Sequence, residues 1–310
     1  MDLRQLQYFC RIAESGSFRE AAERANVAQS ALSRHMRTLE DELGVTLLER
    51  HARGIRLTAQ GEKLKQRADR ILRDVEDTRA ELTSSGASPH GSVTIGASAT
   101  TSRLLYARLA ETTSKRYPDI ELRITEGASY FLLEGLDTGR IDLAVMVAPE
   151  SRSYLSTEPL VTEKVYLVAS ARHANMPDAP CTVRDLAGRP LVLFSRPSGS
   201  RMLLETVAAA QRVALDVRFE AASPDVIKDF IRRGLGYGIM PYSSVFRDVA
   251  SGELVACEFE GIDLTRTFIR RMDRPSSPAV SIIADLVREE FASLKAEGMF
   301  GTETLPVRLR

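Results

Sequence analysis

The segment 29–37 carries the side chains of this chain that are best suited to reading a nucleic acid. It presents two hydroxyl groups and two guanidinium groups at helical spacing and contains no acidic residue; these side chains are Ser30, Ser33, Arg34 and Arg37. Arginine can donate paired hydrogen bonds to guanine O6 and N7 in the major groove, whereas hydroxyls and helix-end amides bond phosphates or base edges. The segment therefore predicts a helix that reads DNA, with a merely solvated polar face as the alternative.

Three short helices are predicted to position this polar stripe, which consists of Ser30, Ser33, Arg34 and Arg37. Apolar residues at helical spacing predict a helix over 3–14. A serine cap with an acid three residues later begins a second helix over 18–25, and the third helix runs over 29–42. Asn26 tolerates the left-handed backbone of a tight turn, and Gly44 can end the third helix. Two helices joined by so short a turn indicate a helix-turn-helix, in which the buried face of the third helix is formed by Leu32, Met36, Leu39 and Leu43.

A second acid-free cluster, from Arg50 to Arg56, follows at the position of a two-stranded wing. Apolar residues flank the cluster and can form two short strands, and Gly54 allows the tip to turn. Arginines here can reach backbone phosphates or a neighbouring minor groove, so their contribution to DNA affinity falls as salt rises. His35 and His51 have no partner at metal-ligand spacing and are interpreted as polar surface.

Many short motifs at fixed spacing cover residues 2–61. They include Gly16-Ser17-Phe18, Val27-Ala28-Gln29-Ser30-Ala31-Leu32-Ser33, Leu47-Leu48-Glu49-Arg50 and Leu57-Thr58-Ala59-Gln60-Gly61. Together they resemble the N-terminal domain of LysR-type transcriptional regulators. The resemblance implies a sequence-specific DNA-binding regulator whose DNA contacts are Gln29, Ser30, Ser33, Arg34, Arg37 and Arg53.

From Thr58 to about Ser85 the chain runs without proline and keeps an apolar seam that alternates steps of three and four residues. The seam lasts about four heptads, as a coiled coil requires, and consists of Leu57, Gly61, Leu64, Ala68, Ile71, Val75, Thr78 and Leu82. A dimerising linker helix is therefore predicted, with an amphipathic surface helix as the alternative. A two-fold dimer would place two reading helices on the half-sites of an inverted repeat.

Strand-like apolar runs alternate with helical segments after residue 91, which is typical of an α/β fold. The strands are predicted to form two small parallel sheets, with a crossing near Thr162-Glu163 and a return near Thr265 to Phe268. A final helix, 280–295, is expected to pack on the first lobe. The resemblance to LysR-type regulators extends loosely here and implies a two-lobed, periplasmic-binding-protein-like effector domain. The predicted domains are an all-α winged helix-turn-helix at 1–60, a linker helix at 58–86 and the α/β effector domain at 91–310, with lobe I at about 91–162 and 267–300 and lobe II at about 163–266.

Hydroxyl-rich loops follow several predicted strands at their carboxyl ends, where open α/β sheets bind ligands. The loop Ala97–Ser102 carries four hydroxyls immediately before a helix, and free amides at a helix N-terminus attract anions. Capping of that helix is the alternative role. Arg196 can bind a small carboxylate or another oxyanion, or can form a surface ion pair. The predicted effector contacts are Ser98, Thr100, Thr101, Ser129, Met146, Ser195, Arg196 and Met240.

Composition and absent motifs narrow the function classes. The 42 Lys and Arg residues balance the 42 Asp and Glu residues, so any DNA contact must come from local clusters of charge. Neither a signal peptide nor a membrane span is recognised, and a cytoplasmic location is expected. Cys10, Cys181 and Cys257 lie far apart without metal-ligand spacing, so no metal or cofactor is expected. A redox sensor that uses Cys181 and Cys257 remains open.

An enzyme is disfavoured because no G-x-S-x-G elbow, P-loop or H-E-x-x-H motif occurs. The predicted function is a DNA-binding transcriptional regulator controlled by a small, anionic effector. A regulator without a ligand and a redox-sensing regulator are the alternatives. The predicted partners are double-stranded promoter DNA, a carboxylate or oxyanion effector, a second copy in a homodimer, further copies in a homotetramer, and RNA polymerase, with no membrane.

Overall fold

The computed structural model describes residues 1–51, 54–83, 88–147, 152–172, 175–177, 180–273 and 276–301. The chain separates into two compact units, of which one contains Met1–Gly91 and the other most of the remaining residues. No helix in these ranges is long and apolar enough to cross a membrane.

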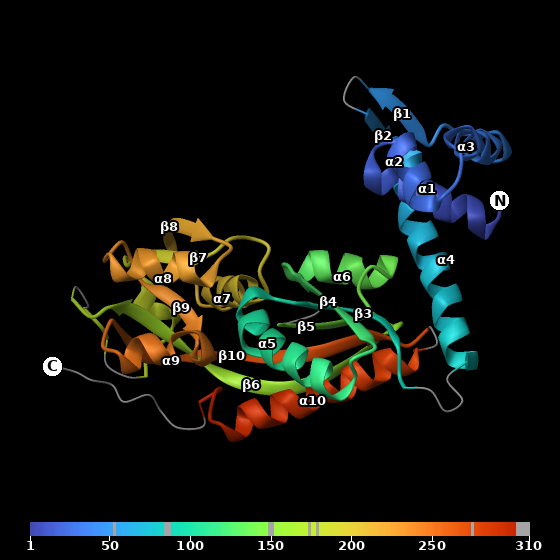
Figure 1. The fold of residues 1–310 in the computed structure, drawn as a ribbon. Coiled ribbons are helices and arrows are strands. Elements are labelled where there is room, and N and C mark those ends of the chain that lie inside the picture. The colour runs from blue at the N-terminus through green and yellow to red at the C-terminus, as the bar shows by residue number, and fades with distance from the viewer. Residues whose placement is uncertain are drawn as a thin grey trace. The chain divides into compact units, whose positions relative to one another are not determined.

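The first unit begins with three helices, α1 (Leu3–Ser15), α2 (Phe18–Ala25) and α3 (Gln29–Leu43) (Figure 1). The Asp2 side chain accepts the amide of Gln5, and a left-handed residue ends each helix: Gly16, Asn26 and Gly44. Apolar side chains from all three helices share one core, which includes Leu6, Phe9, Ile12, Ala21, Leu32, Met36 and Leu39. The predicted helices and the tight turn at Asn26 are therefore confirmed, and the turn fixes α3 against α2.

A two-stranded wing follows, formed by β1 (Leu48–His51) and β2 (Gly54–Leu57). The carboxylate of Glu40 on α3 accepts the amides of Leu47 and Leu48 at 2.6 and 3.2 Å, which ties the start of the wing to α3. The amide of Ile55 donates to the carbonyl of Gly16 at 2.8 Å. A Cβ atom at Gly54 would lie 2.7 Å from that same carbonyl oxygen, so glycine is required for this close approach.

The linker helix α4 (Ala59–Thr83) begins where the Thr58 hydroxyl accepts the amide of Gly61 at 2.9 Å. The first half of the predicted seam does not face outward. Ala68 is fully buried, and Leu64 and Ile71 pack on the core of the first unit. Leu82 is 75% exposed. The first half of the seam therefore packs partly within the chain, and a dimerising role of this helix stays a prediction.

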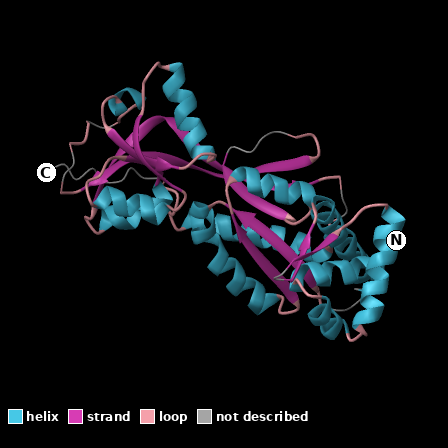
Figure 2. Cartoon of the chain, turned by 90° about the horizontal axis from the view of Figure 1, so that it is seen from above, coloured by secondary structure: helices cyan, strands magenta, loops and turns pink. Residues whose placement is uncertain are grey.

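The second unit contains two lobes of strands flanked by helices (Figure 2). Its first lobe is built from β3 (Gly91–Ala97), α5 (Ala99–Arg116), β4 (Ile120–Glu126), α6 (Ser129–Thr138), β5 (Leu143–Val147) and the final helix α10 (Pro278–Ala296). Its second lobe is built from η1 (Val183–Leu186), β7 (Pro190–Phe194), α7 (Gly199–Ala210), β8 (Asp216–Ala221), α8 (Pro224–Arg232), β9 (Gly238–Pro241) and α9 (Tyr242–Ala250).

Two long strands, β6 (Leu155–Ser170) and β10 (Leu254–Arg271), pair antiparallel and run through both lobes (Figure 1). Among the described residues they join a six-stranded sheet in the order β4-β3-β5-β10-β6-β9, while β7 and β8 form a separate parallel pair. The prediction of two small parallel sheets is therefore wrong. The strands change neighbours near the predicted crossing: β10 pairs with β5 over Arg266–Arg270, and β6 pairs with β9 over Val165–Val168.

The first lobe has its core between the sheet and the two helices α5 and α10. Ile283 and Val287 of α10 share one apolar cluster with Val93, Ile95 and Leu105. The prediction that the final helix packs on the first lobe is confirmed. Every residue of β5 is buried, as expected for a strand covered on both faces. Its carboxyl end and the helix N-termini beside it are thereby held in fixed positions.

Candidate functional site

The polar stripe of α3 is open to solvent. Gln29, Ser30, Arg34 and Arg37 are exposed and Ser33 is partly buried. Within the described part of the chain, neither guanidinium group of this stripe forms an ion pair, whereas Arg24 on α2 pairs with Glu20 at 2.6 Å. Two unpaired cations on one helix face can therefore meet phosphates or guanine edges without first breaking a protein contact.

The N-terminus of α3 adds backbone donors to the same surface. Its N-cap residue is Ala28, which offers no side-chain cap, and the first turn contains no acid. Free amides at such an end carry partial positive charge and favour phosphate oxygens. On the wing, Arg56 is exposed. The predicted contact Arg53 lies outside the described residues.

A cavity of about 320 Å³ lies in the second unit, where the N-termini of α5, α6 and α7 meet. Its wall combines serine and threonine hydroxyls with apolar side chains. The lining residues are Ser98, Ala99, Thr100, Glu126, Gly127, Ala128, Ser129, Val147, Phe194, Ser195, Pro197, Ser198, Gly199, Ser200, Ala222, Pro241 and Leu264. Both lobes contribute to this wall, and the volume falls within the range of about 300–1,000 Å³ that is usual for small-molecule pockets.

Four of the predicted effector contacts lie on this wall, namely Ser98, Thr100, Ser129 and Ser195. The N-caps of α5 and α7 are Ser98 and Ser198, and neither side chain makes a cap hydrogen bond within the described chain. Capping of α5 by its own loop, the alternative left open by the sequence, is therefore not observed. The first amides of both helices are left available to a ligand.

Three other predicted contacts are not among the residues that line the cavity. Met146 is fully buried in one apolar cluster with Leu132, while its neighbour Val147 lines the cavity. Met240 is fully buried in the core of the second lobe, while Pro241 lines the cavity. In both strands the residue that lines the cavity is the next one along, because successive residues of a strand point to opposite faces. Thr101 is also fully buried.

Arg196 forms the surface ion pair that the sequence left open as its alternative role. Its side chain is 67% exposed and pairs with Glu205 at 2.6 Å, and it does not line the cavity. Arg201, which is nearly buried, pairs with the same carboxylate at 2.6 Å. Although burial acts to raise the pKa of Glu205, hydrogen bonds from these two guanidinium groups hold it below its ordinary value. The prediction that Arg196 binds the effector is therefore not supported.

A buried charge pair, which the sequence reasoning did not find, lies next to the cavity. Arg266 on β10 and Glu163 on β6 are both fully buried, and Arg266 Nη2 lies 2.5 Å from Glu163 Oε1. Arg266 also donates to the hydroxyls of Thr100 and Thr101 on α5 and to Ser243 on α9. This guanidinium therefore joins the start of α5 in one lobe to the start of α9 in the other.

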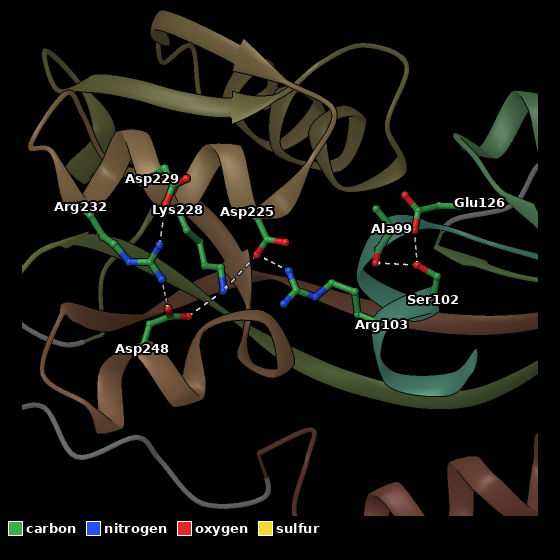
Figure 3. Close-up of polar contacts among 9 residues, drawn as sticks. All are labelled: Ala99, Ser102, Arg103, Glu126, Asp225, Lys228, Asp229, Arg232 and Asp248. Carbon is green, nitrogen blue, oxygen red and sulfur yellow. Dashed lines mark hydrogen bonds and ion pairs between the residues drawn. The ribbon is translucent and has the colours of Figure 1, made fainter. Parts of the chain in front are cut away.

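A second set of charges connects the lobes nearer the surface (Figure 3). Arg103 on α5 pairs with Asp225 on α8, and this contact lowers the pKa of Asp225. Behind it, Lys228 and Asp248 are largely buried and pair at 2.9 Å, and Arg232 also contacts Asp248. In Figure 3 the side chain of Arg103 extends toward Asp225 and away from Glu126 and Ser102.

The three cysteines are all buried. Burial raises the pKa of Cys10 to about 12. Burial also raises the pKa of Cys181, with a further contribution from the neighbouring thiol of Cys257. Because the thiolate is the reactive form, these environments disfavour oxidation chemistry at neutral pH.

Two protein-family models match the chain. The LysR substrate binding domain matches residues 86–292, and the bacterial regulatory helix-turn-helix protein of the lysR family matches residues 3–62. Among curated relatives, the HTH-type transcriptional regulator BbuR of Bordetella bronchiseptica is 31% identical and covers 97% of this chain and 93% of its own length. The hydrogen peroxide-inducible genes activator of Haemophilus influenzae is 27% identical, and the match covers 95% of this chain and 100% of that protein.

Solved structures share the same fold. A full-length OxyR variant from Pseudomonas aeruginosa superposes with a TM-score of 0.71 at 24% identity, covering 94% of both chains. CbnR complexed with its target DNA gives a TM-score of 0.67 at 23% identity, covering 94% of this chain and all of that one. The predicted two-part fold and the prediction of a regulator, not an enzyme, are thus confirmed. The chain belongs to the LysR family of transcriptional regulators.

Proposed function

We propose that this regulator binds promoter DNA through α3 and the wing, and that a small molecule in the cavity between the lobes controls that binding. The observation that carries the DNA part is the exposed, acid-free face of α3 with two guanidinium groups, Arg34 and Arg37, that form no ion pair with any described residue. Gln29 and Ser30 extend this face to the helix end, where phosphate contacts would fix the register on the duplex.

A second copy of the chain is part of the proposal. One small helix-turn-helix buries little surface on DNA, whereas a two-fold dimer reads two half-sites and adds their contacts. The far end of α4, with Val75 partly buried and Leu82 exposed, is proposed as the dimer contact. Pairing of dimers into a homotetramer and contact with RNA polymerase remain predictions from the sequence.

The effector is proposed to be a small molecule that presents an acidic group to the helix ends. With Arg196 directed elsewhere, this proposal rests on the hydroxyls of Ser98, Thr100 and Ser129 and on the uncapped N-termini of α5 and α7. Hydroxyls and amide groups at helix N-termini are suitable donors to a carboxylate.

The test combines DNA binding with ligand binding. Genomic fragments retained by the purified protein are sequenced, and a retained fragment is then used in retardation assays with and without small carboxylates, amino acids and oxyanions. We expect a discrete set of retained fragments, and at least one compound that both raises the melting temperature and changes retardation. Retained fragments with no responsive compound would support the regulator without a ligand and contradict the effector part of this proposal.

A redox-sensing regulator is the second candidate. It is favoured by the proximity of two cysteines, since Cys181 Sγ lies 4.0 Å from the carbonyl oxygen of Cys257, and by a relative named as a hydrogen peroxide-inducible genes activator. Burial of both thiols argues against it. A Cys181→Ser, Cys257→Ser double variant separates the candidates. If peroxide changes DNA retardation by the wild type and not by the double variant, the redox candidate is correct.

A further inference from the structure

Glu126 is the one formally charged side chain among the described residues that line the cavity. We propose that it recognises a protonated amino group on the effector, so that the effector is a small amino acid or a closely related zwitterion. The inference rests on the proposed function, because it specifies the ligand of the same cavity.

The backbone places Glu126 at the cavity edge. It is the last residue of the edge strand β4, and the next amide, from Gly127, donates to Ala97 O at 3.1 Å. This bond joins the end of β4 to the end of β3, beside the start of α5. The carboxylate thus lies next to the hydroxyls and helix ends of the same cavity, within reach of one small ligand.

Within the described ranges, the carboxylate of Glu126 has Ser102 as its hydrogen-bond neighbour. Its Oε2 contacts the hydroxyl of Ser102, which also lies 3.0 Å from Ala99 O (Figure 3). The single proton of that hydroxyl can be donated to one of the two oxygens at a time. Ser102 therefore holds the carboxylate group of Glu126 in place, and hydrogen-bonding capacity of that group remains for a ligand.

No protein cation among the described residues pairs with Glu126. The nearest candidate along α5 is Arg103, which interacts electrostatically with Glu126 but whose guanidinium pairs with Asp225 on the other lobe (Figure 3). A ligand that carried only negative charge would meet this carboxylate unfavourably as it approached the helix ends. An ammonium group on the ligand removes that conflict and forms a charge-assisted hydrogen bond.

The remaining wall suits the other parts of an amino acid. The α-carboxylate can accept bonds from the amides and hydroxyls at the starts of α5 and α7, including those of Thr100 and Ser200. Val147, Phe194 and Leu264 provide apolar surface for a side chain. The cavity volume of about 320 Å³ limits that side chain to a modest size.

The test is isothermal titration of the full-length protein with the twenty amino acids and with 2-hydroxy acids that carry the same side chains. We expect at least one amino acid to bind about 10- to 100-fold more tightly than its 2-hydroxy counterpart, the range expected for one charge-assisted hydrogen bond. Glu126→Gln should lose most of this discrimination. Glu121→Gln, on the same strand but outside the cavity, should retain it. Melting curves without ligand establish that each variant is folded.

Two results would overturn the inference. The first is that a 2-hydroxy acid or an inorganic oxyanion binds at least as tightly as any amino acid. In that case the Glu126→Gln variant would also bind this compound as tightly as the wild type, or more tightly. The proposed function would survive that result. The second is the absence of binding by any amino acid; retardation assays with the other compounds then show whether the cavity responds to a different ligand or to none.

Discussion

Three described arginines lie in different environments, and each environment gives the residue a different role. Arg34 is exposed and unpaired among the described residues, which suits a group that must meet DNA. Arg196 is exposed but already paired with Glu205. Arg266 is fully buried and paired with Glu163. Residue type is visible in a sequence, but pairing and burial depend on contacts between distant segments, so the sequence could not assign these roles.

Arg34 lies on the exposed polar face of α3. Arg34→Ala should weaken binding to a specific fragment by about 1–3 kcal/mol, the value of one bidentate base contact, and should relax sequence preference. Retardation assays with specific and scrambled duplexes measure both effects. Arg116→Ala is the control, because Arg116 pairs with Glu289 in the second unit and should leave DNA affinity unchanged. Normal selectivity of Arg34→Ala would show that α3 does not read DNA through this face.

The second prediction concerns the buried charge pair. Glu163→Gln leaves the cation of Arg266 without its counter-charge and should lower the free energy of unfolding by about 3–5 kcal/mol. Replacing both residues, as in Glu163→Gln with Arg266→Met, removes the unpaired charge and should restore part of the loss. Urea unfolding of the two variants and the wild type measures this. A single variant as stable as the wild type would contradict the role assigned to this pair.

Elements with strong local signals were predictable, and elements that depend on distant pairing were less so. The turn at Asn26 and the ends at Gly16 and Gly44 follow from local backbone chemistry, so α1, α2 and α3 were expected close to their observed bounds. The first half of β6 was missed because the sequence from Leu155 to Glu163 is mostly polar and contains Pro159. Only the apolar second half of β6 resembled a buried strand.

The direction of side chains along strands was the least predictable feature of the cavity. The carboxyl ends of β5 and β9 were identified, yet the residues chosen there were Met146 and Met240, each one position before the residue that lines the cavity. The face of a strand that meets the ligand depends on the pairing register between that strand and its neighbours. A local sequence pattern does not contain this register. The hydroxyls at the starts of helices were easier to predict, because several consecutive residues of the loop before a helix line the cavity.

The linker helix α4 has one end exposed and the other packed on the core of the first unit. Leu82→Asp places a charge on the exposed end of α4 and should convert dimers to monomers without changing the melting temperature of the first unit. Ile71→Asp should instead destabilise the first unit, because Ile71 packs on its core. Sedimentation velocity and thermal melting distinguish the two outcomes. Dimers that persist in Leu82→Asp would exclude this end of α4 as the dimer contact.

At the scale of the whole molecule, effector control requires the two lobes to communicate. Two continuous strands, the buried Arg266 and the surface contact between Arg103 and Asp225 all cross from one lobe to the other. A ligand held between the starts of α5 and α7 therefore acts on groups that also hold the lobes together. Differential contact with the lobes is what allows a ligand to shift a conformational equilibrium.

The contact between Arg103 and Asp225 gives a testable interaction energy between lobes. Both side chains are about half exposed, so a double-mutant cycle with Arg103→Ala and Asp225→Ala should give at most about 1 kcal/mol, and less at high salt. The hydrogen bond from Arg103 lowers the pKa of Asp225, so the contribution is present above the ordinary aspartate range and is lost as pH falls below it. A coupling energy that rises with falling pH would contradict this assignment.

The proposed function requires that the exposed face of α3 reads a specific sequence as part of a two-fold assembly. Selection from a pool of random duplexes, followed by sequencing, tests it directly with the wild type and with the Arg34→Ala, Arg37→Ala variant. We predict that the wild type enriches an inverted repeat with half-sites about one helical turn, or a multiple of it, apart, and that the variant enriches none. No enrichment by the wild type, or the same repeat enriched by the variant, would contradict the claim.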